Sequence, residues 1–390
     1  MNIFTLSKAP LYLLISLFLP TMAMAIDPPE RELSRFALKT NYLQSPDEGV
    51  YELAFDNASK KVFAAVTDRV NREANKGYLY SFNSDSLKVE NKYTMPYRAF
   101  SLAINQDKHQ LYIGHTQSAS LRISMFDTPT GKLVRTSDRL SFVLGKRRRQ
   151  CFEMRHMVYS QDSDTLFVSY SNMLKTAEGM KPLHKLLMLD GTTLALKGEV
   201  KDAYKGTAYG LTMDEKTQKI YVGGRDYINE IDAKNQTLLR TIPLKDPRPQ
   251  ITSVQNLAVD SASDRAFVVV FDHDDRSGTK DGLYIFDLRD GKQLGYVHTG
   301  AGANAVKYNP KYNELYVTNF TSGTISVVDA TKYSITREFN MPVYPNQMVL
   351  SDDMDTLYIG IKEGFNRDWD PDVFVEGAKE RILSIDLKKS

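Results

Sequence analysis

The sequence predicts an all-β fold, a single seven-bladed β-propeller, on three observations. An apolar residue, an aromatic residue and an aliphatic residue or Ala recur together at seven places along the chain. The central aromatics lie 42 to 55 residues apart, which is the spacing of propeller blades. A composition of 42% hydrophobic and 11% aromatic residues excludes a disordered or collagen-like chain. The 390 residues, which length alone would divide into two or three domains, are therefore expected to form one ring.

The first segment of the chain has the pattern of a targeting peptide. Lys8 is followed by an apolar run over residues 11–19 and by the small-residue site Ala23-Met24-Ala25. The run is too short to span a bilayer, so we expect residues 1–25 to be a cleaved signal peptide and residues 26–390 to form the propeller. An uncleaved anchor is the alternative. No later stretch is long and apolar enough for a membrane span, so we expect a periplasmic protein without membrane insertion.

Each repeat carries four strand patterns. The first is a short apolar strand that ends in a polar turn, as in Leu102-Ala103-Ile104 before Asn105. The second strand contains the repeated aromatic, which is Phe63, Tyr112, Phe167, Tyr221, Phe267, Tyr316 or Tyr358. The third strand ends in a residue whose side chain can close a turn by accepting nearby backbone N–H groups, namely Asn83, Asp127, Asp190, Asp232, Asp287, Asp329 or Asp386. A fourth strand follows, as at residues 238–242, and four short strands per repeat are typical of a blade.

The two ends of the chain complement each other. The seventh repeat stops after its third strand, near Leu387, and has no fourth strand of its own. An unassigned strand pattern precedes the first repeat at residues 34–43, with Phe36, Leu38, Thr40 and Tyr42 on one side of a period-2 alternation. We expect this N-terminal strand to complete the last blade, because closure then leaves no blade with an open edge.

The sixth repeat resembles a known motif. Tyr316-Val317-Thr318-Asn319, with Asn309-Pro310 before it and Val327-Val328-Asp329 after it, resembles the YVTN-type β-propeller repeat. The order of repeats and insertions resembles the periplasmic YncE-like proteins over essentially the whole mature chain. Because some YncE-like proteins are regarded as single-stranded DNA binders, the resemblance implies that ligand. Related propellers also include lactonases, lyases, surface antigens and plain binding proteins, so the fold does not decide the function.

Surplus residues concentrate in five insertions. One lies between the second and third repeats and four lie between second and third strands, at residues 138–154, 67–77, 172–185, 271–281 and 362–380. In a propeller, both kinds of connection emerge on the same face, which we call the insertion face. The opposite face, which we call the short-turn face, keeps short connections. The insertion face is therefore the expected working surface.

Charge on the insertion face is uneven, although the whole chain is nearly neutral with 50 Lys and Arg against 48 Asp and Glu. Residues 138–155 contain six cations and two acids. The insertions at residues 271–281 and 362–381 are both mildly acidic. Overall charge gives no reason to expect a polyanion as partner, so such an affinity would come from the basic sector alone.

The candidate ligand-binding residues are cations, aromatic rings and amides expected on the insertion face. Cations and rings together are typical of single-stranded nucleic-acid binding, and the set is Lys146, Arg147, Arg148, Arg149, Tyr97, Arg98, Arg155, His156 and Tyr209. Trp369 adds one candidate stacking ring. Asn256, Asn304 and Asn346 stand at similar places in three repeats, where they either bind a ligand at the channel mouth or bond backbone groups between blades. A solvated loop, or a loop that docks on a protein, remains the alternative for the basic run.

No linear catalytic, metal or cofactor motif is present in the sequence. The lone Cys151 excludes an intrachain disulfide. We therefore expect a monomeric, non-catalytic protein that binds single-stranded DNA or another polyanion, with a scaffold for envelope proteins as the first alternative. An enzyme of lyase or lactonase type is the second, because propeller enzymes assemble their sites from several blades. It would use His156 or His115 as general base and Arg155 to hold the substrate anion at the channel mouth.

Overall fold

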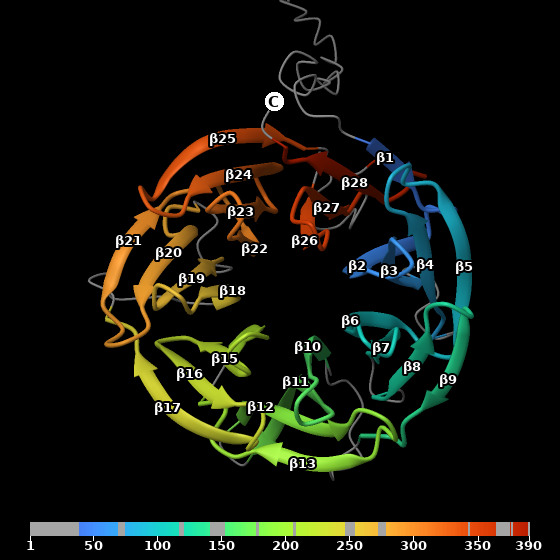
Figure 1. The fold of residues 1–390 in the computed structure, drawn as a ribbon, viewed down its shortest axis with the longest axis horizontal. Helices are drawn as coiled ribbons and strands as arrows, with labels where there is room; N and C mark the ends of the chain where they lie inside the picture. The colour runs from blue at the N-terminus through green and yellow to red at the C-terminus, as the bar shows by residue number, and fades with distance from the viewer. Residues whose placement is uncertain are drawn as a thin grey trace, which may run out of the picture.

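The protein forms a ring of β-sheets around a central axis. The computed structural model describes residues 39–68, 75–116, 121–140, 153–176, 179–205, 208–245, 254–271, 278–341, 344–363, 375 and 377–388. Within these ranges, 28 strands form seven four-stranded antiparallel sheets, each of which is one blade (Figure 1). The predicted all-β, seven-bladed propeller is confirmed.

In blades 1 to 6 the strands follow chain order from the axis outward. Blades 1 and 2 contain β2 (Glu48–Asp56), β3 (Lys61–Asp68), β4 (Gly77–Asn83) and β5 (Val89–Met95), then β6 (Ala99–Asn105), β7 (Gln110–His115), β8 (Ile123–Asp127) and β9 (Lys132–Thr136). Blades 3 and 4 contain β10 (Glu153–Ser160), β11 (Thr165–Thr176), β12 (Gly179–Asp190) and β13 (Leu196–Val200), then β14 (Ala208–Asp214), β15 (Lys219–Gly224), β16 (Tyr227–Asp232) and β17 (Thr237–Pro243). Blades 5 and 6 contain β18 (Val254–Asp260), β19 (Arg265–Val270), β20 (Gly282–Asp287) and β21 (Gln293–Val297), then β22 (Ala303–Asn309), β23 (Glu314–Asn319), β24 (Thr324–Asp329) and β25 (Ser334–Asn340).

Blade 7 joins the two ends of the chain. It contains β26 (Pro345–Leu350), β27 (Thr356–Ile361), β28 (Arg381–Asp386) and, as its outermost strand, β1 (Lys39–Tyr42), which lies beside β28 in Figure 1. The antiparallel register runs from Lys39 opposite Ser384 to Tyr42 opposite Arg381. The predicted closure by an N-terminal strand is therefore confirmed.

The side chains on one side of the closing strand were expected to alternate with those on the other, but the described members of that side, Thr40 and Tyr42, do not face the core. Thr40 and Tyr42 are exposed, and the strand is held by backbone pairing and by its neighbours. Asn41 Nδ2 donates to the backbone oxygen of Leu87 in blade 1 at 2.8 Å. Leu43, which directly follows the strand, is 1% exposed and packs with the apolar cluster between blades 7 and 1. Phe36 and Leu38 lie outside the described residues.

The core is divided among the interfaces between blades. Seven apolar clusters are present in the described part of the chain, and each lies between one pair of neighbouring blades. All seven aromatics predicted in the second strands are buried. Hydroxyl groups among them also cross between blades, since Tyr112 donates to the backbone oxygen of Gly191 and Tyr358 to that of Ser84. The repeated aromatic therefore fixes how each blade packs on the next.

Turns after the third strands form as the sequence predicts. Asp232 Oδ1 accepts the backbone N–H groups of Lys234 and Asn235, both at 2.9 Å. These bonds hold the pKa of Asp232 below its usual range. The equivalent side chains bond backbone N–H groups two or three residues on, and they are Asn83, Asp127, Asp190, Asp287, Asp329 and Asp386. This role is structural.

One predicted insertion has a regular structure. Residues 172–185, expected as a loop on the insertion face, continue the second and third strands of blade 3. The pairing of β11 with β12 runs from Thr165 opposite Asp190 to Thr176 opposite Gly179. Blade 3 therefore extends beyond its neighbours on the insertion face as a hairpin.

Candidate ligand-binding site at the channel mouth

Every inner strand contains a bulge near its start. The pairing with the second strand shifts register in all seven blades, which leaves at least one inner-strand residue without a partner opposite it. The chain enters each inner strand from the insertion face, so these residues lie at that end of the channel. We call the first such residue of each blade a member of the mouth ring, which consists of Tyr51, Phe100, Arg155, Tyr209, Gln255, Asn304 and Asn346. Each stands twelve residues before the buried aromatic of its own blade.

Amide groups connect the mouth ring from blade 6 to blade 1. Asn304 Nδ2 donates to Asn346 Oδ1 at 2.8 Å, and Asn346 Nδ2 donates to the backbone oxygen of Tyr51 at 3.3 Å. Both bonds run between blades, and that of Asn346 reaches a backbone group, which is one of the two roles that the sequence left open for these asparagines. Asn256 differs from them, because Gln255 occupies the equivalent place in blade 5 and Asn256 pairs with Val269 one position later. The predicted equivalence of the three asparagines is therefore wrong for Asn256.

Aromatic rings and cations lie at the channel mouth in blades 1 to 4. The Tyr51 and Phe100 rings lie 4.7 Å apart between their centres, and Lys362 Nζ lies 3.5 Å from the centre of the Tyr51 ring. In blades 3 and 4, the Arg155 guanidinium lies 4.6 Å from the centre of the Tyr209 ring. Tyr51, Phe100, Arg155 and Tyr209 are partly exposed. Lys362 is only 4% exposed and its Nζ lies 4.0 Å from Glu380 Oε2, so it holds the Tyr51 ring in place from inside. Arg155 is the partly exposed cation beside the rings of the mouth, an arrangement that suits stacking of planar groups.

Tyr97 and Arg98 differ in exposure, although they are adjacent in the sequence. The Tyr97 ring is partly exposed, lies 5.4 Å from the His115 ring and carries the Arg122 guanidinium at 5.7 Å. Arg98 is only 8% exposed, and its Nη2 donates to Thr67 Oγ1 of blade 1 at 3.3 Å. Arg98 therefore joins two blades and does not lie open on the insertion face, contrary to the expectation for it.

His115 cannot act as a general base for a bound substrate. It is 0% exposed, its Nε2 lies 2.7 Å from Ser124 Oγ, and burial lowers its pKa to about 4. His184 is also structural, because its Nδ1 lies 2.7 Å from Ser171 Oγ and its ring contacts the edge of Tyr209. Burial, and then the charge of Arg155, lower the pKa of His184 to about 4. Both imidazoles are therefore neutral at pH 7.

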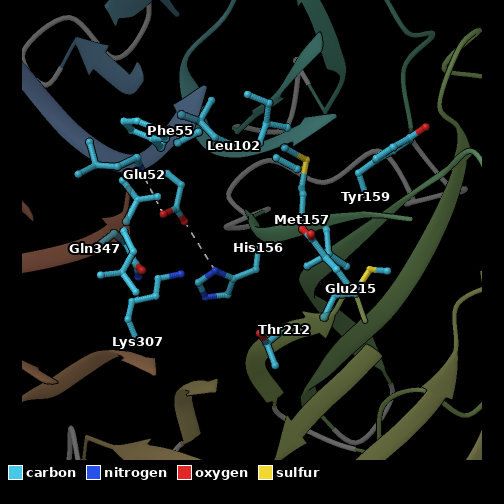
Figure 2. A pocket seen from close by; sticks show the side chains of 18 of the residues that line it. Glu52, Phe55, Leu102, His156, Met157, Tyr159, Thr212, Glu215, Lys307 and Gln347 are labelled. Atoms are coloured by element: carbon cyan, nitrogen blue, oxygen red, sulfur yellow. Dashed lines mark hydrogen bonds and ion pairs between the residues drawn. The ribbon is translucent and has the colours of Figure 1, made fainter. Parts of the chain in front are cut away.

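His156 turns away from the mouth and into the channel. Its Nδ1 lies 3.7 Å from Glu52 Oε2, and both side chains line a cavity of about 460 Å³ (Figure 2). The cavity also contacts Asn256, Lys307 and Gln347 and reaches the turns after the inner strands, on the short-turn face. The side chains of Arg155 and His156, expected to serve one ligand together, therefore point in different directions, Arg155 to Tyr209 at the mouth and His156 into the channel cavity.

Several candidate residues lie outside the described ranges. These are Lys146, Arg147, Arg148 and Arg149 of the basic run, with Cys151 and Trp369. Within the described ranges, no group of three or more His, Cys, Asp or Glu side chains is placed to hold a metal ion. No helix found there is long and apolar enough to cross a membrane.

Comparison with known proteins agrees with the architecture. No family model matches the chain. The uncharacterized protein YncE of Salmonella typhi is 28% identical over 326 residues, which cover 82% of this chain and 85% of that protein. YncE of Escherichia coli K12 is 26% identical over 322 residues, with 81% and 83% covered. The chain fits a YncE-like β-propeller family.

The fold of this chain also resembles a more distant solved structure. A chain of Kuenenia stuttgartiensis hydrazine synthase superposes with a TM-score of 0.62 over 82% of this chain and 94% of that chain. The two are 10% identical, so the likeness concerns the fold alone.

Among the rings and cations of the channel mouth, Tyr51, Phe100 and Lys362 were not predicted from the sequence, and neither was the amide of Gln255. Tyr51 and Phe100 follow the same twelve-residue offset as Arg155 and Tyr209, so the offset would have identified them. Lys362 reaches Tyr51 from just after β27, and no local pattern indicates that contact.

Proposed function

We propose that the protein is an exported, non-catalytic β-propeller that binds single-stranded DNA on its insertion face. Export rests on the signal-peptide pattern of residues 1–25, and the periplasm is the proposed location. The choice of ligand rests on the channel mouth, where Arg155 lies over Tyr209 and the rings of Tyr51 and Phe100 are partly exposed. That pairing of rings with a cation is the observation that supports the proposal most.

Single-stranded DNA offers both groups that this surface complements. Its bases can stack on partly exposed rings, and each stacked base contributes about 1–3 kcal/mol. Its phosphates attract cations, and residues 138–155, which lead directly into Arg155, contain six cations against two acids. A duplex hides its base faces, so the rings favour a single strand.

The test is a fluorescence anisotropy titration of the purified mature protein with a labelled oligothymidylate, repeated at several salt concentrations. We expect saturable binding that weakens linearly with the logarithm of salt concentration, because phosphate contacts release counterions. A duplex of the same length should bind more weakly. Absence of binding at low salt, or equal affinity for the duplex, would overturn the choice of ligand. A protein-docking surface is then the remaining use of this face.

A further inference from the structure

The cavity in the central channel extends from the residues that directly follow the mouth ring to the turns of the short-turn face. Its volume of about 460 Å³ lies within the range of small-molecule sites. All seven inner strands contribute to its wall, and the turn residues Asn57, Gln106, Glu215 and Asp352 lie at its rim on the short-turn face. A ligand here would not compete for the insertion face.

Lys307 breaks the repeat pattern in this cavity. It stands nine residues before the buried aromatic of blade 6. The equivalent residues of the other six blades are small or apolar, or in one case Thr, and they are Ala54, Ala103, Val158, Thr212, Ala258 and Val349. Six blades have a short side chain at this position of the repeat, and blade 6 has a lysine. Local departures of this kind from a repeat pattern are typical of functional positions.

The charge of Lys307 is not neutralised by the protein. Among the described residues, its Nζ makes no hydrogen bond and does not approach Glu52 closely enough to form an ion pair. Burial lowers the pKa of Lys307, and the charge of Glu52 opposes that shift. Lys307 is partly buried and has no counter-ion among the described residues, so this position favours an anionic group from outside the chain.

Glu52 is the complementary feature. Its carboxylate has His156 Nδ1 at 3.7 Å, which is beyond hydrogen-bond distance, and accepts a 3.3 Å bond from the backbone N–H of Leu53. In Figure 2 the side chains of Glu52, His156 and Lys307 point toward one another from three different blades. The cavity therefore holds a cation and a carboxylate that face the same space without pairing with each other, and His156 is the side chain that lies within ion-pair distance of Glu52.

We propose that this cavity binds a small zwitterion of the amino-acid class, with its carboxylate on Lys307 and its ammonium group on Glu52. A ligand with only one of these groups would leave the other protein charge uncompensated. The amides of Asn256 and Gln347 lie on the same wall and supply further donors and acceptors. Ala54 and Ala103 leave room for the carbon chain of the ligand.

The test is isothermal titration calorimetry of the full mature protein with glycine, β-alanine, 4-aminobutyrate and 6-aminohexanoate. This series lengthens the carbon chain and with it the distance between the two charges. We expect one member to bind best, with weaker binding on either side of it in the series. Butyrate and butylammonium, which match the chain length of 4-aminobutyrate but carry one charge each, should bind at least about tenfold more weakly than the best member.

Two substitutions identify the site. Lys307→Met and Glu52→Gln should each weaken the best member at least about tenfold, because each leaves one ligand charge unpaired. Lys108→Met is the matched control, since Lys108 is exposed on the short-turn face beside Asp164. A thermal melt of each variant shows whether it remains folded. If either variant does not fold, the titrations of the wild-type protein with the four zwitterions and the two single-charge compounds test the proposal without it. No binding by any member, binding that survives both substitutions, or butyrate binding as tightly as the zwitterions would each overturn the proposal.

Discussion

The guanidinium carbon of Arg155 lies 4.6 Å from the centre of the Tyr209 ring, so the inner strands of blades 3 and 4 meet at the channel mouth. The next residue, His156, lies in the same bulge but points to Glu52 inside the channel. A single irregularity in β10 therefore supplies one residue to the insertion face and one to the channel cavity.

Removing the Tyr209 ring should weaken DNA binding. We expect Tyr209→Ala to reduce the affinity for oligothymidylate by about 1–3 kcal/mol, the contribution of one stacked base, whereas Tyr209→Phe keeps the ring and most of the affinity. Tyr42→Ala is the control, because Tyr42 is exposed on the outer strand of blade 7. Anisotropy titrations measure all three variants. Equal losses from Tyr209→Ala and Tyr42→Ala would refute a stacking role.

Neutralising the basic run should change the salt dependence of binding. Replacing Lys146, Arg147, Arg148 and Arg149 together by Gln should reduce the steepness of the plot of log affinity against log salt by about 0.7 for each DNA phosphate that the protein no longer neutralises. The control replaces four exposed lysines on the short-turn face, Lys108, Lys132, Lys216 and Lys234, and makes the same change in net charge. If both quadruple variants change the slope equally, general charge and not the insertion face attracts the DNA.

Closure of the ring should depend on Leu43. Its side chain is buried between blades 7 and 1, and its backbone N–H donates to the oxygen of Glu380 at 2.8 Å. Leu43→Ala should lower the free energy of unfolding by about 2–5 kcal/mol through the cavity it leaves. Leu239→Ala, at an exposed position of β17, should change it by less than about 0.5 kcal/mol. Urea titrations give both values, and similar stabilities for the two variants would contradict the closure.

Stability should fall on acidification through His115. Burial lowers the pKa of His115 from 6.5 to about 4, so the unfolded chain binds a proton between these pH values and the folded protein does not. This contribution is complete above pH 6.5, is lost as the pH falls toward 4 and amounts to about 3 kcal/mol. Urea unfolding across this pH range measures it. His115→Gln should make the dependence shallower and leave the part that comes from His184, whose pKa burial also lowers to about 4. An unchanged slope in that variant would rule His115 out as a source.

Most of the fold could be predicted because each blade repeats the same packing contacts and the same turn. The second-strand aromatic packs between blades and the Asp turn satisfies backbone groups locally, so both leave a pattern in the sequence, as Tyr112 and Asp232 illustrate. Closure by β1 followed from a missing strand. The orientation of Tyr42 did not follow, because alternation alone does not say which side of an outer strand meets solvent.

The site was predicted less completely because bulges shift the register of the inner strands. Arg155 and Tyr209 were identified by residue type, but the same criterion placed Asn256 in the mouth ring, where Gln255 stands. Arg98 was expected on the surface, and only the contact of its guanidinium with Thr67 shows that it joins two blades. Lys307 is recognised as an exception only when the seven inner strands are aligned by their distance in sequence from the second-strand aromatics.

Photo-crosslinking tests the proposed binding surface most directly. An oligonucleotide with 5-bromodeoxyuridine in place of thymidine would be bound to the mature protein, irradiated and digested, and the crosslinked peptides identified by mass spectrometry. We expect crosslinks in peptides that contain Tyr51, Phe100 and Tyr209, because these rings lie at the channel mouth. Crosslinks confined to the turns of the short-turn face, such as those around Asn57 and Glu215, would contradict a DNA-binding surface on the insertion face.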